Sequence, residues 1–294
     1  MAGETSTGSL TSALPSIVAQ ARLIREYEGT WMRTCDVQKQ TPNTGLNWTE
    51  FSLNQINKQT ITETTDNRNY QTLSGQLLST EPQLSQVIIK ITDKTYRKLA
   101  SVVTAKFGSL CGNAMKRGED EDYLALFSSF GTGASPGTGN PISFGHISAA
   151  VNRARSNVTE PSNAEVFTVL HGYGIYDLQN EILAGVGTYT VQNGLTEEMY
   201  RKGFAGSVAD SNVYVDGNMT VDSTPDANGA THTRDGVVAC RGMAIKTEKD
   251  RDIYFGGGAD VVSMVSEYSF IERTSAGSQV FAYRHLHDAT APTS

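Results

Sequence analysis

The spacing of apolar residues changes near the end of the first third of the chain. Val87 to Ile91 form a short β-branched run that predicts a buried strand. After Asp93, apolar side chains recur three and four residues apart, which predicts one long helix to about Arg117. Gly118 is expected to end this helix, and the acids at 119–122 to form the charged first turn of a short helix that follows. A metal site made by these acids is the alternative.

Similar patterns divide the rest of the chain. Residues 10–28 carry an apolar stripe that predicts a helix, either packed on the body or docked as an arm on a neighbouring chain. Glycine-rich residues 131–139 indicate a domain boundary, and 217–236 are expected to form a polar loop. Helices are predicted at 144–156, 173–184 and 196–202, and strands at 166–170, 213–215, 237–245, 261–272 and 279–286. This mixture of elements indicates an α+β fold.

Residues 40–85 differ from the rest because they are polar almost throughout, with sparse apolar positions. Their threonines favour extended structure, and Thr65-Asp66-Asn67-Arg68 offers turn chemistry, so we predict a long hairpin that projects from the body. A two-stranded ribbon is marginally stable alone in water. We therefore expect support from another surface, that of a neighbouring chain. A solvated surface insertion is the alternative.

Composition narrows the classes of function. The 294 residues suffice for one large domain or two small ones. A net charge of −7 without a basic cluster disfavours a dedicated nucleic-acid-binding protein. The N-terminus lacks the pattern of a signal peptide, and no apolar stretch approaches the ~20 residues needed to span a bilayer. Three widely separated cysteines, Cys35, Cys111 and Cys240, indicate reduced, partly buried thiols.

Familiar motifs for catalysis, cofactors and metals are missing from the sequence. The glycine-rich stretch 131–139 lacks the Gly-Lys-Ser/Thr end of a phosphate loop. His285 and His287 would share one face of a strand, but without a third ligand we expect a surface pair. Residues 224–235 depart from the ligand pattern of a calcium loop and predict a turn. We therefore predict no catalytic residue, no metal site and no cofactor.

Taken in order, these parts resemble the major capsid proteins of tailed bacteriophages, whose Hong Kong 97-type fold is shared with encapsulin shells. Residues 10–35 resemble the N-terminal arm, 40–85 the extended loop, and Val87 to Arg117 the strand and spine helix of the peripheral domain. Further similarity lies in the acidic segment 119–127, the helix–strand–helix of the axial domain at 144–183, the Gly-x-x-Gly turn and strand at 203–215, and the final strands at 261–286. The resemblance covers nearly the whole chain and rests on order and spacing.

The resemblance implies an α+β fold with an N-terminal arm, an extended loop, a peripheral domain with a spine helix, and an axial domain. The implied ranges are the arm at 1–38, the loop at 39–86, the peripheral domain at 87–135, the axial domain at 136–250, and return strands of the peripheral domain at 251–294.

The resemblance also implies a subunit without enzymatic activity. Copies would self-assemble in the host cytoplasm into hexamers and pentamers of the icosahedral virion shell, which contains DNA without sequence-specific binding. The expected partners are other copies of the chain, a portal, a scaffolding protein and, in some members, a decoration protein. Because the arm begins almost directly after Met1, we expect the scaffold to be a separate protein.

Shell subunits contact several copies of themselves through patches that close by symmetry. The sequence shows no obvious apolar patch, so we expect arms and loops to make these contacts. Trp48, Phe51, Leu53 and Ile56 are the candidate inter-subunit contacts, because aromatic and aliphatic side chains carry most of the energy of an interface. The alternatives are an encapsulin-type shell with protein cargo, a phage tail or decoration protein, and an α+β enzyme with an unrecognised carboxylate site.

Overall fold

The structure is a computed structural model, and it describes residues 29–41, 45–64, 66–98, 107–131, 133, 135–157, 160–185, 206–255, 257–273 and 281–292. The helices are α1 (Trp31–Thr34), α2 (Asp93–Lys98), α4 (Phe107–Leu126), α5 (Phe144–Arg155) and α6 (Gly172–Gly185), with 3-10 turns η2 (Phe127–Ser129) and η3 (Arg234–Gly236). The strands are β1 (Asp36–Lys39), β2 (Trp48–Leu53), β3 (Gly75–Thr80), β4 (Gln83–Thr92), β5 (Val166–Leu170), β6 (Ser207–Val208), β7 (Ser211–Val215), β8 (Asp226–Thr233), β9 (Val237–Asp252), β10 (Ala259–Glu272) and β11 (Ala282–Asp288). The expected helices at 10–28 and 196–202 lie outside the described residues.

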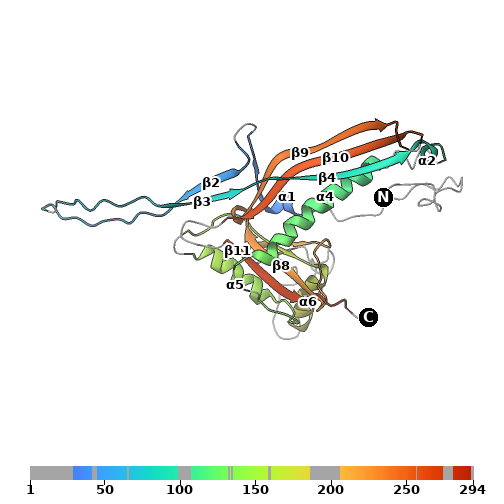
Figure 1. Cartoon of the computed structure of the whole chain (residues 1–294). Helices are drawn as coiled ribbons and strands as arrows, with labels where there is room; N and C mark the ends of the chain where they lie inside the picture. Colours follow the sequence, from blue (N-terminus) through green and yellow to red (C-terminus); the bar gives the residue numbers. More distant parts are fainter. Residues whose placement is uncertain are drawn as a thin grey trace.

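The described strands form three sheets that occupy different parts of the molecule (Figure 1). A long four-stranded sheet has the order β1-β9-β10-β4, and α4 runs along it. A compact five-stranded sheet has the order β11-β8-β5-β7-β6 and carries α5 and α6. The third sheet is the β2–β3 hairpin, which projects alone from the end of the long sheet. The mixed α+β architecture is as predicted.

The long helix extends further than its sequence pattern indicated. Gly118 was expected to end it, but α4 continues through Gly118 to Leu126. Glu119 and Asp120 are buried, so the expectation of a charged first turn at 119–122 was wrong. Glu119 is buried against Arg241 of β9, with its Oε2 2.8 Å from an arginine nitrogen. These long-range partners stabilise acids that a solvated helix start would have left exposed.

The expected polar loop at 217–236 was also wrong in part, because β8 crosses it as a buried central strand. Its pairings are antiparallel to β5 and to β11. Glycine is required at one of its positions: a Cβ on Gly229 would lie 2.6 Å from Leu170 and 2.8 Å from the carbonyl of Val169. Small residues thus let three strands pack closely, and this packing outweighs the turn-forming composition.

His285 and His287 were expected at the surface, but both are buried in β11. The Nε2 of His285 lies 2.8 Å from the hydroxyl of Thr231 in β8. The ring of His287 donates through Nδ1 to the carbonyl of His285 at 3.2 Å. Burial lowers the pKa of His285 to about 4, so this ring is neutral at neutral pH.

Strand pairing distributes the second half of the chain differently from the ranges derived from the sequence. β9 had been placed mostly with the axial domain, yet it pairs with β10 and β1 in the long sheet. β11 had been placed with the peripheral return strands, yet it pairs with β8 in the compact sheet. The reason is that the chain crosses between the two sheets twice after residue 226, once from β8 to β9 and once from β10 to β11.

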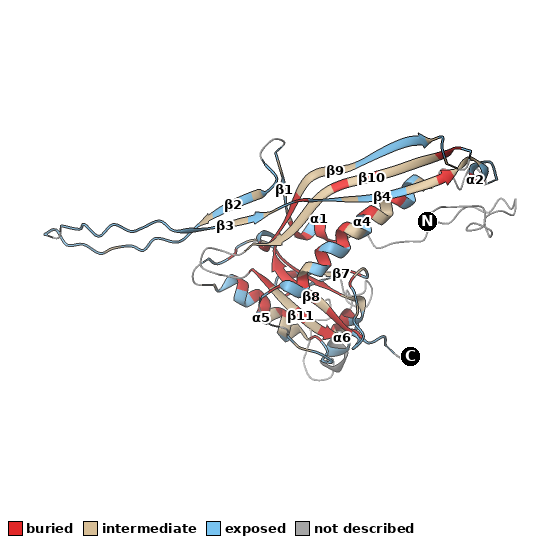
Figure 2. Ribbon diagram, in the orientation of Figure 1, coloured by how far each residue is buried: buried red, intermediate tan, exposed pale blue. Residues whose placement is uncertain are grey.

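Buried side chains concentrate in the compact sheet and where α4 meets β9 and β10 (Figure 2). Every residue of β5 is buried, as its apolar run predicted. The three cysteines are buried free thiols, in agreement with the prediction. Hydrogen bonds between Ser143 and the His146 ring cap the N-terminus of α5, including one of 3.2 Å from the Ser143 backbone N–H to Nδ1.

Candidate functional site

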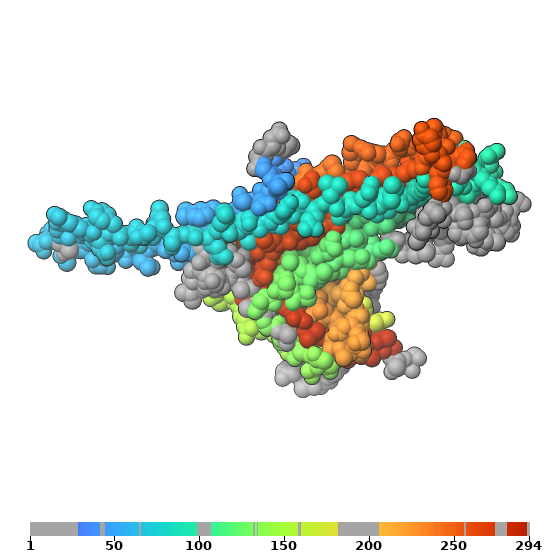
Figure 3. Space-filling model, in the orientation of Figure 1, coloured from blue at the N-terminus to red at the C-terminus, as the bar shows by residue number. Residues whose placement is uncertain are grey.

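The hairpin is a two-faced ribbon that extends away from every other described element (Figure 3). Strands β2 and β3 pair antiparallel, with Phe51 opposite Leu77 and Glu50 opposite Leu78. Because side chains alternate between faces, Trp48, Glu50, Leu78 and Thr80 share one face and Phe51, Leu53 and Leu77 share the other. The first face is half-buried, whereas the second is exposed.

The exposed face of the ribbon is apolar. Phe51, Leu53 and Leu77 are 60%, 61% and 61% exposed, although each is a residue type that ordinarily seeks burial. We call these three residues the apolar face. Gly75 supports its geometry, because a Cβ there would lie 2.5 Å from the Phe51 ring. The ring therefore lies across a position that only glycine leaves open.

Three of the four candidate contact residues are exposed, and the fourth is half-buried. Phe51 and Leu53 belong to the apolar face, and Ile56 is exposed further out along the arm. Trp48 lies on the opposite face and is half-buried, so it belongs to the root of the hairpin. The expectation of no apolar patch missed Leu77, which only the strand register places beside Phe51.

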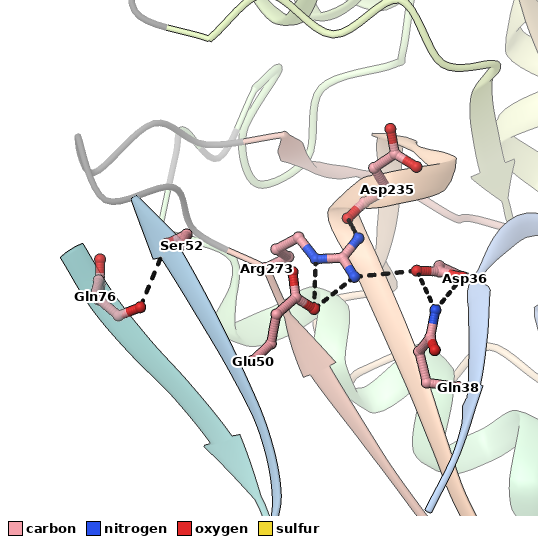
Figure 4. Close-up of polar contacts among 7 residues, drawn as sticks. All are labelled: Asp36, Gln38, Glu50, Ser52, Gln76, Asp235 and Arg273. Atoms are coloured by element: carbon pink, nitrogen blue, oxygen red, sulfur yellow. Dashed lines mark hydrogen bonds and ion pairs between the residues drawn. The ribbon is translucent and has the colours of Figure 1, made fainter. Parts of the chain in front are cut away.

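Arg273, which follows β10 directly, joins the root of the hairpin to the long sheet (Figure 4). Its guanidinium lies 2.7 Å from Glu50 of β2 and 3.0 Å from Asp36 of β1, and it donates to the carbonyl of Asp235 at 2.7 Å. Burial lowers the pKa of Arg273, but hydrogen bonds to Glu50 and Asp36 outweigh burial and leave that pKa above its ordinary value. Arg273 therefore remains charged and clamps three segments together.

Beyond Leu53 the two arms of the hairpin are bridged by amide side chains. Asn57 donates its backbone N–H to Gln71 Oε1 at 2.8 Å, and Gln59 donates Nε2 to the Asn69 carbonyl at 2.9 Å. Between these bridges lies an open groove of about 740 Å³ that Ile56, Tyr70 and Leu73 help to line. These contacts are all exposed to water, so they contribute little to the stability of the arm by themselves.

Within the described residues, no group of three or more His, Cys, Asp or Glu side chains is placed to hold a metal ion. Among the described helices, none is both long and apolar enough to cross a membrane.

Comparisons with solved structures identify the architecture. The head structure of Helicobacter pylori bacteriophage KHP40 is similar with a TM-score of 0.72 at 11% sequence identity, covering 97% of this chain and 98% of that chain. The fold is the Hong Kong 97-type capsid fold. The capsid structure of cyanophage P-SCSP1u gives a TM-score of 0.70 at 10% identity, covering 96% of this chain and 94% of that chain.

A third capsid, that of Ralstonia phage GP4, has a TM-score of 0.65 at 12% identity, covering 94% of this chain and 95% of that chain. No family model and no curated protein matches the sequence. Identities near 10% mean that the Hong Kong 97-type fold is kept here by the order and packing of elements, with few side chains in common. The prediction of this fold from the order of elements is confirmed.

Proposed function

We propose that this chain is the major capsid protein of a tailed phage and assembles into hexamers and pentamers of an icosahedral shell. The observation that carries the proposal is the apolar face of the hairpin, displayed by a chain that has the Hong Kong 97-type fold over nearly its whole length. Large apolar side chains grouped on one exposed surface mark interaction sites.

Energetics favour another copy of the chain as the occupant of this face. Each fully buried Leu or Phe contributes roughly 1.5–3 kcal/mol, and two-stranded ribbons are marginal alone. Covering Phe51, Leu53 and Leu77 with a neighbouring subunit would stabilise both the interface and the ribbon. Because the Arg273 clamp sets the direction in which the hairpin leaves the long sheet, the same contact can repeat around a ring.

The remaining parts of the proposal follow from this role. The portion at 39–86 acts as an extended loop, the long sheet with α4 as a peripheral domain, and the compact sheet as an axial domain. The shell forms in the host cytoplasm and encloses DNA without reading its sequence. A portal, a separate scaffolding protein and a decoration protein are its proposed partners.

Particle formation by the expressed chain tests the proposal. We expect closed shells by electron microscopy and a fast-sedimenting peak in a sucrose gradient. The triple variant Phe51→Ser, Leu53→Ser, Leu77→Ser should lose the shells while its circular dichroism spectrum and thermal transition as a free subunit match those of the parent. The matched control Phe51→Leu, Leu53→Met, Leu77→Met keeps the apolar character and should still assemble.

Several outcomes would contradict the proposal. Shells of normal yield from the serine variant would show that the apolar face is not the contact. Tubes or rings in place of closed shells would indicate a tail component, and particles filled with protein cargo an encapsulin-type compartment. An enzyme gains no support from the strongly perturbed Asp216, because that side chain has no surface that a substrate could reach.

A further inference from the structure

Two carboxyl groups meet in the interior where the long sheet, the compact sheet and the N-terminal side of the chain come together. Asp120 lies in α4 and Asp216 directly follows β7, and neither has exposed surface. Thr30 bridges them: its backbone N–H donates to Asp120 Oδ1 at 2.9 Å and its hydroxyl donates to Asp216 Oδ2 at 3.0 Å. Asn218 bridges them again, through its amide to Asp120 Oδ2 at 2.9 Å and its backbone N–H to Asp216 Oδ1 at 2.9 Å.

Both bridges hold the two carboxyl groups close together. Thr30 and Asn218, which donate to both carboxyl groups, are neutral, and Asp216 also has a side-chain hydrogen bond with Asp120. Two adjacent negative charges in a buried site are costly, so one carboxyl group retains a proton that the other can accept. Burial, the largest cause, and the neighbouring Asp120 together raise the pKa of Asp216 to about 7, against the opposing hydrogen bonds from Asn218 and Thr30.

Other titratable groups face this pair from each packed element. Cys35 and Tyr123 have pKa values raised first by burial, so both are neutral at neutral pH. His232 of β8 accepts from the Tyr123 hydroxyl at 2.7 Å, and burial lowers its pKa to about 4. Glu119, next to Asp120 in α4, forms an ion pair with Arg241, and Lys116 of the same helix acts on it as well. Asp36 is close enough to Cys35 to raise the pKa of that thiol.

Thr30 lies where the two carboxyl groups join separate parts of the fold. The described part of the chain begins at Gly29, where a Cβ would lie 2.7 Å from Asp120 Oδ1, and α1 begins directly after Thr30. Because Asp120 belongs to α4 and Asp216 to the compact sheet, these four hydrogen bonds tie three separate parts of the fold together. A charge change at the pair therefore acts on all three.

We propose that Asp120 and Asp216 form a proton-linked latch, in which one shared proton holds Thr30 at the junction of the two sheets and loss of that proton to solvent loosens Thr30. The direction follows from linkage. A carboxyl group with a raised pKa favours the closed state at low pH, and this advantage disappears as pH rises from about 4 to about 7. Asparagine at position 216 cannot lose a proton, so it should keep the latch closed at all pH values.

Hydrogen exchange at the Thr30 amide tests the latch in the full chain, because that N–H donates to Asp120. After correction for intrinsic rates, protection of Thr30 should fall by up to about tenfold per pH unit between pH 5 and 7 and level off above. Asp216→Asn should flatten this profile. The control Glu272→Gln removes a half-buried carboxyl group whose pKa burial also raises to about 7, and it should leave the Thr30 profile unchanged.

A Thr30 profile without pH dependence in the parent, or the same slope in Asp216→Asn, would overturn the latch. If Asp216→Asn fails to fold, carbon-13 labelling of aspartate side chains in the parent still decides: a buried carboxyl group must titrate near pH 7, and a spectrum in which every aspartate titrates below pH 6.5 contradicts the proposal. Neither measurement requires particles, so failure of the latch and failure of shell assembly are seen separately.

Discussion

The hairpin and the compact sheet use apolar strand residues in opposite ways. In β5 every residue from Val166 to Leu170 is buried between β7 and β8. In β2 and β3 the apolar face points into solvent, and the ribbon has no second layer among the described residues. Both regions pair their backbones regularly, so hydrogen bonding does not distinguish them. The compact sheet is thus stabilised within one chain, whereas the exposed apolar face of the hairpin supports the proposal that a neighbouring copy covers it.

Replacing one leucine by alanine in each region tests this comparison most directly, and the larger effect is expected in the compact sheet. Leu170 is fully buried in β5, so Leu170→Ala should lower the free energy of unfolding of the free subunit by about 2–5 kcal/mol. Urea titration followed by circular dichroism measures this loss. A change below about 1 kcal/mol would mean that the compact sheet is not the stabilising core.

Low pH should destabilise the compact sheet and leave the hairpin unaffected. His232 and His285 are buried with pKa values lowered by burial to about 4, so they stay neutral in the folded state while the unfolded chain gains protons below pH 6.5. Stability from each neutral ring is therefore present above pH 6.5 and is lost as pH falls toward 4, by up to about 3 kcal/mol per histidine. Asp216 has the opposite effect, because the stability that its raised pKa contributes is present at low pH and is lost as pH rises from about 4 to about 7.

Comparing the parent with a His285 variant isolates the contribution of this ring to the pH dependence of stability. His285→Asn should lose less stability than the parent between pH 6.5 and 4.5, measured as urea midpoints at each pH. The hairpin carries no histidine, so exchange rates of its amides, corrected for intrinsic chemistry, should stay constant until the body unfolds. Parallel pH profiles for parent and variant would refute the assignment of acid sensitivity to this ring.

The root of the hairpin should show a smaller effect. Arg273→Met removes the contacts to Glu50 and Asp36 but keeps the length of the stem. Hydrogen bonds to charged groups contribute about 1.5–3 kcal/mol, but this site is partly open to water, so we expect the free energy of unfolding to fall by about 1–2 kcal/mol. Hydrogen exchange of the Trp48–Leu53 amides should also become faster. Arg273→Lys keeps the charge without the fork and should recover only part of the loss. An unchanged exchange rate would show that the clamp does not orient the arm.

The smallest change in subunit stability is expected for a substitution in the apolar face of the hairpin. Leu77 is exposed, so Leu77→Ala should alter the free energy of unfolding of the free subunit by less than about 0.5 kcal/mol. The same variant should raise the protein concentration needed for shell assembly, measured by light scattering. A large loss of subunit stability would show that the apolar face already packs within its own chain.

Local pattern was sufficient for features whose cause is local. The apolar run at 166–170 predicts a buried strand because a strand of that composition is stable only in an interior. The polar, threonine-rich segment predicts a projecting hairpin because it holds too few apolar residues to form a core. The capsid fold was predicted from the resemblance of this order of elements to that of tailed-phage capsid proteins, and the fold is confirmed.

Tertiary structure alone decided the features whose partners are distant in sequence. Acids at 119 and 120 are buried because Arg241, Thr30 and Asn218 reach them from other elements. β8 is a central strand because its small residues fit between β5 and β11, and His285 and His287 are buried on the second of these neighbours. Sequence by itself thus determined the buried strand at 166–170 and the projecting hairpin. Which side chains face inward depended on distant partners, such as Asp216 for Thr30, which lies 186 residues away, and no local periodicity contains that information.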